Sequence, residues 1–416
     1  MLPSHAAVVV AGGGPAGFMA AITAAEAGLG EVLVLEATQE PLHKVRISGG
    51  GRCNVTHACW DPADLVGHYP RGGRALRGPF AQFAPGDAVG WFDAHGLELV
   101  QEDDGRLFPR SNRSSSVVAT LRRAAAAAGV GLETGRALRE VEALTEGGGF
   151  RLELRDGTRL RCDRLVLATG SHPSGHRIAR ALGHGLVPPV PSLFTLRLAE
   201  RSLGGLAGVT MDPVALELPL GKRCLRERGP VLITHWGLSG PATLRLTAFA
   251  ARALRERGYH GELVVDWTGG RDPAEVSALL DEARRGLARR QLGAARPWPG
   301  LSRRLWRHLL AAQGVGEDRR WAELDRACQR RLEEALRADR HTITGRGPFG
   351  EEFVTAGGIP LGEVNLATME SRLRPGLHLV GELLDVDGVT GGFNFQHCWS
   401  SGWLAGRALA RAAALT

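Results

Sequence analysis

Three glycines near the N-terminus have the spacing that binds a dinucleotide. They form Gly12-x-Gly14-x-x-Gly17, with Pro15 and Ala16 before the last glycine. Gly12 allows a tight turn, Gly14 lets the backbone approach a pyrophosphate, and Gly17 lets the following helix pack close to the preceding strand. The helix N-terminus then offers free N–H groups and a partial positive charge to the phosphates.

Acidic residues and glycines at the ends of later strands are further candidates for binding the dinucleotide. Glu36 ends the next apolar run, where a carboxylate can accept hydrogen bonds from ribose hydroxyls and disfavours a 2′-phosphate. One such unit could hold NAD or FAD. Two later segments favour FAD, because a protein that holds only NAD needs no C-terminal return strand of this type. They supply as further cofactor-binding candidates Thr169, Gly170, Gly381, Glu382, Asp387, Gly391, Gly392, Phe393 and Asn394.

A further group of cofactor-binding candidates lies between residues 44 and 54. The three successive glycines predict backbone N–H groups lying against the flavin. Arg52 could meet the pyrophosphate or the flavin O2, and the alternative is a surface arginine in a mobile loop. The candidates of this stretch are Lys44, Ser48, Gly49, Gly50, Gly51, Arg52, Cys53 and Asn54.

Four side chains are candidates for proton transfer or redox chemistry. Cys53 could be a redox partner or an acid, and packing is the alternative. His235 could donate a proton or orient the substrate, and a structural histidine is the alternative. His397 and Cys398 are expected at the start of the last helix, whose N-terminus would lower the pKa of both groups. Packing is the alternative for Cys398 as well.

Apolar runs and turn residues predict the elements that position these candidates. A strand, the glycine turn, a helix and a second strand follow one another within the first 36 residues. Residues 37–80 are rich in Gly and Arg and predict a long functional loop. The expected strands are 6–11, 31–36, 97–100, 106–108, 151–154, 159–162, 164–168 and 377–381, and the expected helices 18–27, 84–95, 113–128 and 396–413.

The pattern changes twice along the chain, which predicts an interrupted domain. Prolines near residue 190 precede short alternating strands, and residues 272–340 have helical periodicity. The predicted fold class is α/β, with a Rossmann-like, glutathione-reductase-like FAD-binding domain. That domain comprises residues 1–190 and 368–416. It is interrupted by a small antiparallel β-barrel module, residues 191–268 and 341–367, and by a helical insert, residues 269–340.

Composition restricts the class of protein. The net charge of +7 permits nucleic-acid binding, although only two residues are lysines and an arginine-rich GC-rich genome is the alternative explanation. Six scattered cysteines without zinc spacing predict free thiols, no metal centre and a cytoplasmic location. We expect no membrane partner, because no apolar run is long enough to cross a bilayer.

Six ordered segments resemble the bacterial flavoproteins called BaiN-type NAD(P)/FAD-dependent oxidoreductases. The resemblance implies non-covalent FAD, a transient NAD(P)H reductant, and an FAD domain interrupted by a barrel and a helical module. Gln396-His397-Cys398-Trp399 departs from the family, which more often carries Trp or Ala in the middle, so an activity of another branch need not transfer. The matching segments are 44–56, 108–111, 234–241, 354–359, 368–371 and 381–394.

The resemblance also implies reduction of a conjugated C=C bond by hydride transfer from N5 of reduced flavin. One branch reduces steroid enones, and another converts uracil in ribosomal RNA to dihydrouridine. We hypothesise an RNA uracil reductase, with a small-molecule enone reductase and a non-catalytic flavin-stabilised RNA- or protein-binding module as alternatives. The ordered segments disfavour a folate- and FAD-dependent RNA methyltransferase. Candidates for a phosphate track, or for solvated surface, are Arg71, Arg74, Arg77, Arg110 and Arg113.

Overall fold

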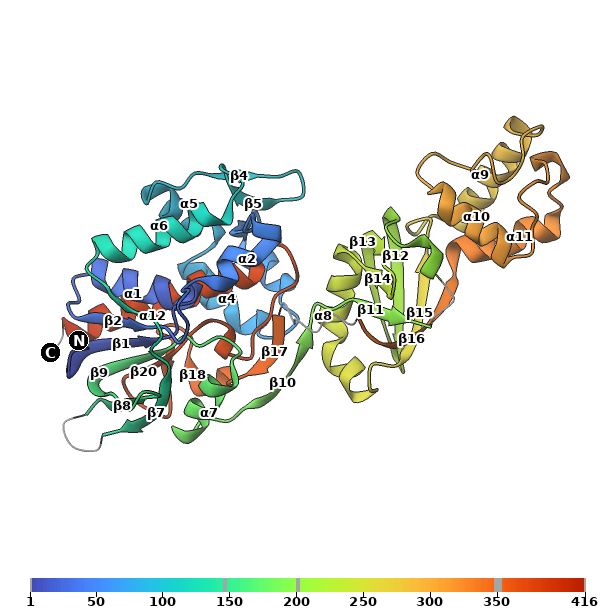
Figure 1. Ribbon diagram of the computed structural model, residues 1–416. Helices are drawn as coiled ribbons and strands as arrows, with labels where there is room; N and C mark the ends of the chain where they lie inside the picture. The colour runs from blue at the N-terminus through green and yellow to red at the C-terminus, as the bar shows by residue number, and fades with distance from the viewer. Residues whose placement is uncertain (1, 145–147, 200–202, 348–353, 415–416) are drawn as a thin grey trace. The chain divides into compact units, whose positions relative to one another are not determined.

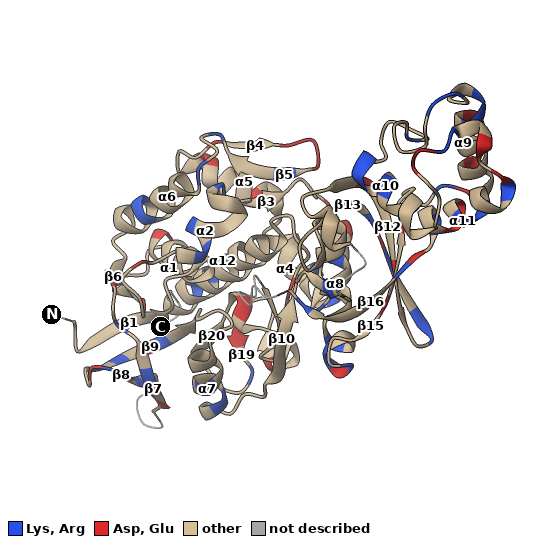
Figure 2. Ribbon diagram, turned by 45° about the vertical axis from the view of Figure 1, so that its right-hand side comes forward, with Lys and Arg blue, Asp and Glu red and all other residues tan. Residues whose placement is uncertain are grey.

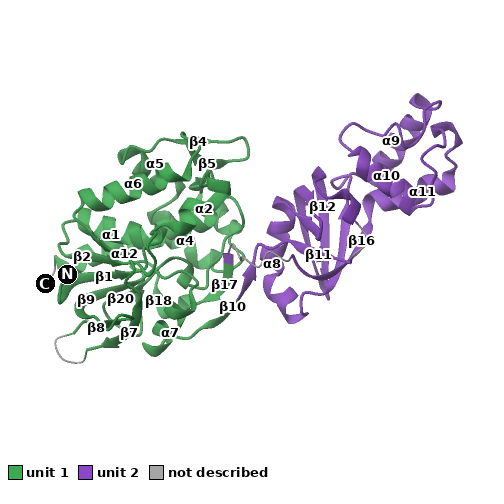
Figure 3. Ribbon diagram, in the orientation of Figure 1, with its two compact units in different colours: residues 1–189, 355–416 green, residues 190–354 purple. Residues whose placement is uncertain are grey.

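The chain folds into two compact units (Figure 3). Unit 1 comprises residues 1–189 and 355–416, and unit 2 comprises residues 190–354. The structure is a computed structural model and describes residues 2–144, 148–199, 203–347 and 354–414. The chain leaves unit 1 within β10 (Val187–Ser192) and returns within β17 (Val354–Gly358), and these two strands pair with each other.

A mixed sheet whose central strands are parallel forms the centre of unit 1 (Figure 1). Its central strand β1 (His5–Ala11) lies between β2 (Val32–Leu35) and β9 (Arg159–Leu167) and is parallel to both. β2 is apolar and buried throughout, as a strand covered on both faces must be. The sheet continues through β6 (Gly131–Glu133), β20 (Leu377–Leu379), β19 (Glu370–Ser371) and β18 (Val364–Asn365), with the hairpin β7 (Leu138–Ala143) and β8 (Phe150–Leu154) beside β9.

Two long helices that pack against each other carry the glycine turn and the C-terminal segment. α1 (Pro15–Glu26) follows the turn, and α12 (Phe393–Ala413) ends the chain. The remaining elements of unit 1 are α2 (His43–Gly51), β3 (Thr56–His57), α3 (Pro62–Leu65), η1 (Val66–His68), α4 (Gly73–Gln82), α5 (Pro85–Ala94), β4 (Leu99–Gln101), β5 (Arg106–Pro109), α6 (Ser114–Ala127), α7 (Pro173–Ala181), η4 (Leu361–Glu363) and η5 (Gly381–Leu383).

Small residues let α1 and α12 approach closely. A Cβ atom on Gly402 would lie 2.4 Å from the carbonyl oxygen of Ala16, and one on Gly406 would lie 2.6 Å from that of Ala20. Residues four apart share one face of a helix, so this face of α12 lies directly against the backbone of α1. The contact fixes the first turn of α12 relative to the glycine turn.

Unit 2 contains a closed six-stranded barrel and a helical insert. The barrel order is β11-β14-β13-β12-β15-β16, with every pairing antiparallel. Trp306 and Trp321 stack in the core of the insert, with ring centroids 5.8 Å apart. The elements are β11 (Leu196–Leu198), η2 (Gly204–Leu206), β12 (Thr210–Leu220), β13 (Arg223–Ile233), β14 (Gly237–Ser239), α8 (Pro241–Glu256), β15 (Gly261–Asp266), α9 (Pro273–Gly286), α10 (Arg303–Ala312), η3 (Trp321–Glu323), α11 (Arg326–Arg337) and β16 (Asp339–Arg346).

The α/β Rossmann-like prediction is confirmed, and so is the antiparallel barrel. Three local predictions were wrong. Residues 37–80 contain short helices instead of one loop, and the strands predicted at 159–162 and 164–168 are the single strand β9. The last helix begins at Phe393, three residues before the predicted start, because Gly392 takes the left-handed conformation that caps it.

The predicted boundary between barrel and FAD-binding domain also differs from the observed division. Residues 355–367 group with unit 1 instead of with the barrel. The reason is pairing, because Val364 and Asn365 form β18 and extend the sheet of unit 1 beside β19. The helices α9, α10 and α11 lie within the predicted insert 269–340.

The α1–α12 contact gives a first prediction. Gly402→Ala should lower the free energy of unfolding by about 1–3 kcal/mol, because the new methyl group overlaps backbone and forces the helices apart. Gly90→Ala is the matched control, since Gly90 lies in α5 with nothing within 4 Å of its Cβ position. That change should stabilise by about 0.5–1 kcal/mol. Denaturant unfolding measures both, and equal stability of the two variants would contradict the packing account.

Candidate functional site

The glycine turn lies at the carboxyl ends of the parallel strands. Gly12 has a φ of +115°, and a Cβ atom there would lie 2.4 Å from the carbonyl oxygen of Ala168 at the end of β9. A Cβ atom on Gly17 would lie 2.0 Å from the carbonyl oxygen of Gly12. Gly14 is different, because the nearest atom to its Cβ position is 4.0 Å away. The turn is therefore closed towards the sheet and open at Gly14.

Glu36 holds the turn in shape. One carboxylate oxygen accepts a hydrogen bond from the Gly13 N–H at 2.8 Å, and the other accepts from the N–H and hydroxyl of Thr38. The oxygen that accepts from Gly13 has a further lone pair, so the carboxylate can also accept from a ribose hydroxyl. The sequence reasoning missed Thr38, whose only signal is its position two residues after Glu36.

The glycine loop at the end of α2, residues 48–51, turns one face towards open space. Gly49, Gly50 and Gly51 have φ values of +56°, +66° and +84°, and nothing lies within 4 Å of a Cβ position on the last two. The N–H of Cys53 donates to the carbonyl oxygen of Ser48 at 3.1 Å and closes the loop. A chain in this conformation can bring its backbone against a ligand.

Arg52 does not point its guanidinium at a vacant anion site. The group forms an ion pair with Glu102, donates to Asn112 and stacks over the ring of Phe108, 4.0 Å from the centroid. A planar guanidinium is suited to this combination of stacking and hydrogen bonding. These are the partners of Arg52 in the structure, and the expectation that Arg52 meets the pyrophosphate or the flavin O2 stays a prediction.

Two ion pairs tie distant segments to the end of β20. Nζ of Lys44 donates to a carboxylate oxygen of Glu382 at 2.5 Å. Burial disfavours the charge of Lys44, but the carboxylate of Glu382 outweighs this effect and raises the pKa of Lys44. Asp387 is fully buried and forms an ion pair with Arg71. Removing one partner of a buried pair is strongly destabilising, so Arg71 is part of this scaffold.

Hydrogen bonds between the Asn394 side chain and the Gly388 backbone close the loop before α12. The side-chain oxygen of Asn394 accepts from the Gly388 N–H at 2.8 Å, and its amide nitrogen donates to the Gly388 carbonyl oxygen at 2.9 Å. The side chain therefore holds the loop, whereas the sequence predicted hydrogen bonds near the flavin ring. A Cβ atom on Gly392 would lie 2.8 Å from the backbone of Thr56, so Gly392 also acts through close backbone approach.

Phe393 packs against two histidines that the sequence reasoning missed. Its ring centroid lies 4.7 Å from that of His57 and 4.2 Å from that of His68. Nδ1 of His57 pairs with the carbonyl oxygen of Gly391 at 3.1 Å, and Tyr69 donates to the carbonyl oxygen of Phe393 at 2.6 Å. His57 follows the glycine loop closely enough to have been a candidate, but no sequence signal links His68 or Tyr69 to residue 393.

His397 and Cys398 lie in the second turn of α12, beyond the unpaired N–H groups of its first turn. Burial lowers the pKa of His397 to about 4. Burial, followed by the nearby Glu382 carboxylate, raises the pKa of Cys398 above its usual range. The expectation that a helix N-terminus lowers the Cys398 pKa was wrong. The predicted direction holds for His397, but burial is the cause.

The hydrogen bond of His397 fixes which ring nitrogen carries the proton. Nε2 lies 3.2 Å from the carbonyl oxygen of Gly381. A carbonyl oxygen only accepts, so Nε2 donates and Nδ1 of the neutral ring is a lone-pair acceptor. The folded-state pKa lies below the ordinary 6.5, so folding loses stability as the pH falls from 6.5 towards 4.

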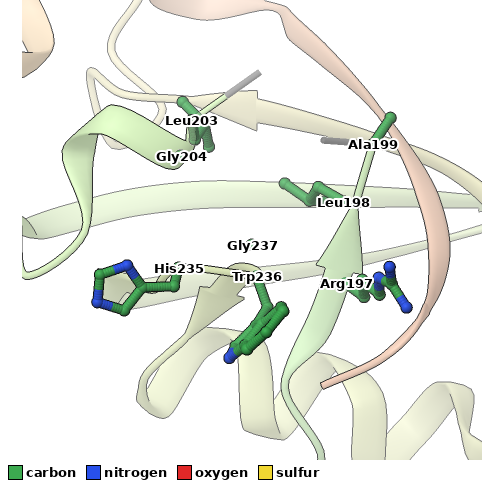
Figure 4. A pocket seen from close by; sticks show the side chains of 8 residues that line it. All are labelled: Arg197, Leu198, Ala199, Leu203, Gly204, His235, Trp236 and Gly237. Carbon is green, nitrogen blue, oxygen red and sulfur yellow. The ribbon is translucent and has the colours of Figure 1, made fainter. Parts of the chain in front are cut away.

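His235 belongs to unit 2, whereas the other three catalytic candidates belong to unit 1. It lies in a tight turn, in which the Thr234 hydroxyl accepts from the N–H groups of Trp236 and Gly237. The turn borders a cavity of about 220 Å³ (Figure 4). The residues around the cavity are Arg197, Leu198, Ala199, Leu203, Gly204, His235, Trp236 and Gly237.

Comparison with protein families decides where the chain belongs. The model of the HI0933-like protein Rossmann domain matches residues 6–408. A 3-dehydro-bile acid delta(4,6)-reductase of Clostridium scindens is 32% identical, over 96% of this chain and 98% of that protein.

The chain belongs to the HI0933-like flavoprotein family. The family resemblance seen in the sequence is thereby confirmed. A ribosomal RNA dihydrouridine synthase of Escherichia coli is 29% identical to this HI0933-like chain, over 95% of the chain and 96% of that protein. Among solved structures, 3-ketosteroid delta1-dehydrogenase of Sterolibacterium denitrificans has a TM-score of 0.54 at 13% identity, covering 99% of this chain and all of that one, which shows a shared fold. The coarse assignment is an FAD-family oxidoreductase.

The residues of this HI0933-like protein fit FAD. Three predicted site residues carry buried polar atoms without a hydrogen-bond partner in the structure: Asn54 Oδ1, Thr169 Oγ1 and His397 Nδ1. Buried polar atoms in folded proteins are normally paired, so such atoms are expected where a ligand supplies the partner. The Asn54 oxygen lies 2.9 Å from a Cβ position on Gly392, at the start of α12.

Other classes of site find no support in the part of the chain that the structure describes. No group of three or more His, Cys, Asp or Glu side chains there could hold a metal ion. Among the same residues, no helix is both long and apolar enough to span a bilayer. All six cysteines are free thiols.

Thiol burial gives a second prediction. Burial raises the pKa of Cys53 from the ordinary 9.0 to about 12, so its thiolate fraction near neutral pH falls about a thousandfold. Iodoacetamide should therefore label exposed Cys224 in the native protein and spare Cys53 and Cys398, whereas all six cysteines label after denaturation. Peptide mass spectrometry reads the result. Labelling of Cys398 as fast as Cys224 would contradict the burial assigned here.

Proposed function

We propose that the protein is an FAD-dependent oxidoreductase that reduces a C=C bond conjugated with a carbonyl group, with NAD(P)H as the reductant. The observation that carries the proposal is the common chemistry of two relatives that match nearly the whole chain. One is named for a bile acid delta(4,6)-reduction and the other for dihydrouridine synthesis. The molecules differ, but each name describes saturation of a ring double bond, and that reaction is what the relatives share.

Bound FAD, once reduced, supplies a hydride at N5. One hydride and one proton add across the substrate double bond, while NAD(P)H is oxidised to NAD(P)⁺. The first turn of α1 and the open face of Gly50 and Gly51 would bind the cofactor. His397 would orient it, because its Nδ1 can accept but not donate a hydrogen bond.

The remaining requirement is a proton donor, and we assign this role to His235. Cys53 and Cys398 hold their protons too tightly for ready transfer near neutral pH, because burial raises the pKa of both. His235 is exposed and borders a cavity. A histidine ring can both donate and accept a proton, which is the chemistry that this step requires.

A uracil in ribosomal RNA and a small steroid-type enone are the two candidate substrates. The 32% identity to the bile acid reductase favours the enone. The 29% identity to the ribosomal RNA enzyme, together with the basic net charge of +7, favours the uracil. A third candidate is a non-catalytic module in which FAD only stabilises a binding surface.

Anaerobic half-reactions give the third prediction. NADH or NADPH should bleach the bound flavin, and a 3-keto-4-ene steroid or deproteinised ribosomal RNA should then reoxidise it without oxygen. His235→Gln should slow reoxidation by about 10²–10⁴-fold, because it removes the proton donor. Cys224→Ser, at an exposed thiol of the same unit, is the matched control and should react like the wild type.

The outcomes separate the candidates. If neither NADH nor NADPH bleaches the flavin, the reductase proposal is contradicted and the non-catalytic binding module is the remaining candidate. A flavin that bleaches but is reoxidised by neither substrate would contradict C=C reduction in both classes. Unchanged reoxidation in His235→Gln would remove His235 from the reaction.

A further inference from the structure

The positive charge of the protein resides entirely in unit 2. Unit 1 contains 24 basic residues (Lys and Arg) and 24 acidic residues (Asp and Glu), so its net charge is zero. Unit 2 contains 27 basic and 20 acidic residues. The net charge of +7 therefore belongs to 165 of the 416 residues. An arginine-rich genome cannot account for this difference, because both units are encoded together and share its bias.

The helical insert carries most of this excess. Residues 273–337, which run from α9 to the end of α11, contain 14 arginines, no lysine and nine acidic residues. Figure 2 shows these basic positions on the insert's helices and along the loops between them. Some are neutralised locally, since Arg284, Arg307 and Arg319 form ion pairs with neighbouring carboxylates.

Nine exposed arginines of the insert form no ion pair with a described carboxylate. Arg303, Arg304 and Arg331 are three of them, and the other six are considered together. We call these six the insert arginines. Their aliphatic neighbours on the same helices, such as Leu280 and Leu332, are buried in the core of unit 2. Exposed charge on one side and buried apolar side chains on the other show that these arginines serve the surface and not the packing. The insert arginines are Arg285, Arg289, Arg290, Arg320, Arg326 and Arg330.

Backbone pairing gathers several of them in one place. Gln291 pairs with Arg320 in an isolated antiparallel bridge, and the N–H of Trp321 donates to the carbonyl oxygen of Arg290 at 3.0 Å. Arg289 and Arg290 therefore lie beside Arg320, although the two segments are about thirty residues apart. Arg285 occupies the last turn of α9, four residues before Arg289. Like charges held this close repel one another unless an anion lies between them.

The composition of the surface identifies the kind of anion. Arginine presents a planar fork of donors that matches phosphate. A membrane surface normally also requires exposed Trp, Phe or Leu side chains for insertion. Residues 273–337, all of which the structure describes, contain no large hydrophobic side chain of the exposed class. The pattern therefore fits a nucleic-acid backbone better than a lipid surface.

We propose that the insert arginines dock the phosphate backbone of a folded RNA. The inference deepens the proposed function, because it selects an RNA-borne uracil as the substrate class. It also places the phosphate contacts on unit 2, whereas the sequence suggested five arginines of unit 1 as a phosphate track. Of those, Arg71 is committed to buried Asp387 and Arg110 forms an ion pair with Glu98.

The test, and the fourth prediction, measures binding of the FAD-loaded full chain to a fluorescein-labelled RNA hairpin over a range of salt concentrations, without NAD(P)H. The quadruple variant Arg285→Glu, Arg289→Glu, Arg290→Glu and Arg320→Glu should bind at least about tenfold more weakly. Its slope of log K against log salt should fall by about 3–4, since each phosphate contact contributes about 0.9. The corresponding Arg→Gln variant should show the same loss to a smaller extent.

The matched control reverses four exposed arginines of unit 1, namely Arg74, Arg77, Arg113 and Arg122. It changes the net charge equally, and its affinity should stay within about twofold of the wild type. Melting temperature and flavin content verify that both variants fold. Wild-type affinity and slope in the insert variant would overturn the proposal, as would binding to anionic phosphatidylglycerol vesicles without binding to RNA.

Separate measurements of RNA binding and of flavin reduction distinguish RNA docking from the proposed reductase activity. Flavin bleaching by NAD(P)H is measured on the same preparations without RNA, and it should be equal in the wild type and the insert variant. Loss of RNA binding with normal bleaching supports docking by the insert. Normal RNA binding by the wild type with no bleaching leaves docking intact and contradicts only the reductase proposal.

Discussion

The contact between backbone and backbone at four glycines is the constraint on which unit 1 depends. Gly12 and Gly17 press the start of α1 against the ends of the strands, and Gly402 and Gly406 press α12 against α1. At each position a single methyl group would overlap a carbonyl group of the neighbouring element. Because these contacts are between main chains, the positions of the two helix starts do not depend on side-chain rotamers. The polar groups of the site take their places from this frame.

Ion pairs and aromatic stacking then attach the more distant segments to the frame. Lys44 joins the glycine loop to Glu382, and Arg71 joins η1 and α4 to Asp387. The contacts of the Phe393 ring with His57 and His68 hold the segment that precedes α12. The charged side chains of Lys44, Glu382, Arg71 and Asp387 are therefore paired with one another. What remains for a ligand is backbone N–H groups, open glycine faces and a few unpartnered oxygen and nitrogen atoms.

The sequence predicted the parts of the structure that follow from local pattern. The glycine turn, Glu36 and the apolar strands are recognisable because spacing and periodicity define them. The helices within residues 37–80 are not, because contacts with distant residues stabilise them, as where Gly72 at the start of α4 packs against Val386. The partners of Arg52 and the stack around Phe393 join residues far apart in the sequence. Burial, which no local pattern reveals, reversed the expected pKa direction at Cys398.

The unequal charge of the two units suggests that they bind different ligands. Unit 1 is neutral as a whole, and unit 2 carries seven excess positive charges. Cofactor binding by backbone groups needs little net charge, whereas binding a polyanion needs much. The two requirements are met by different parts of one chain.

The most direct test of the central claim is a crystal structure of the protein with FAD bound. The account predicts pyrophosphate oxygens within hydrogen-bond distance of the N–H groups in the first turn of α1. It also predicts ligand atoms against Gly14 and against the open face of Gly50 and Gly51. FAD bound elsewhere in the chain, or bound with these glycine faces left in solvent, would contradict it.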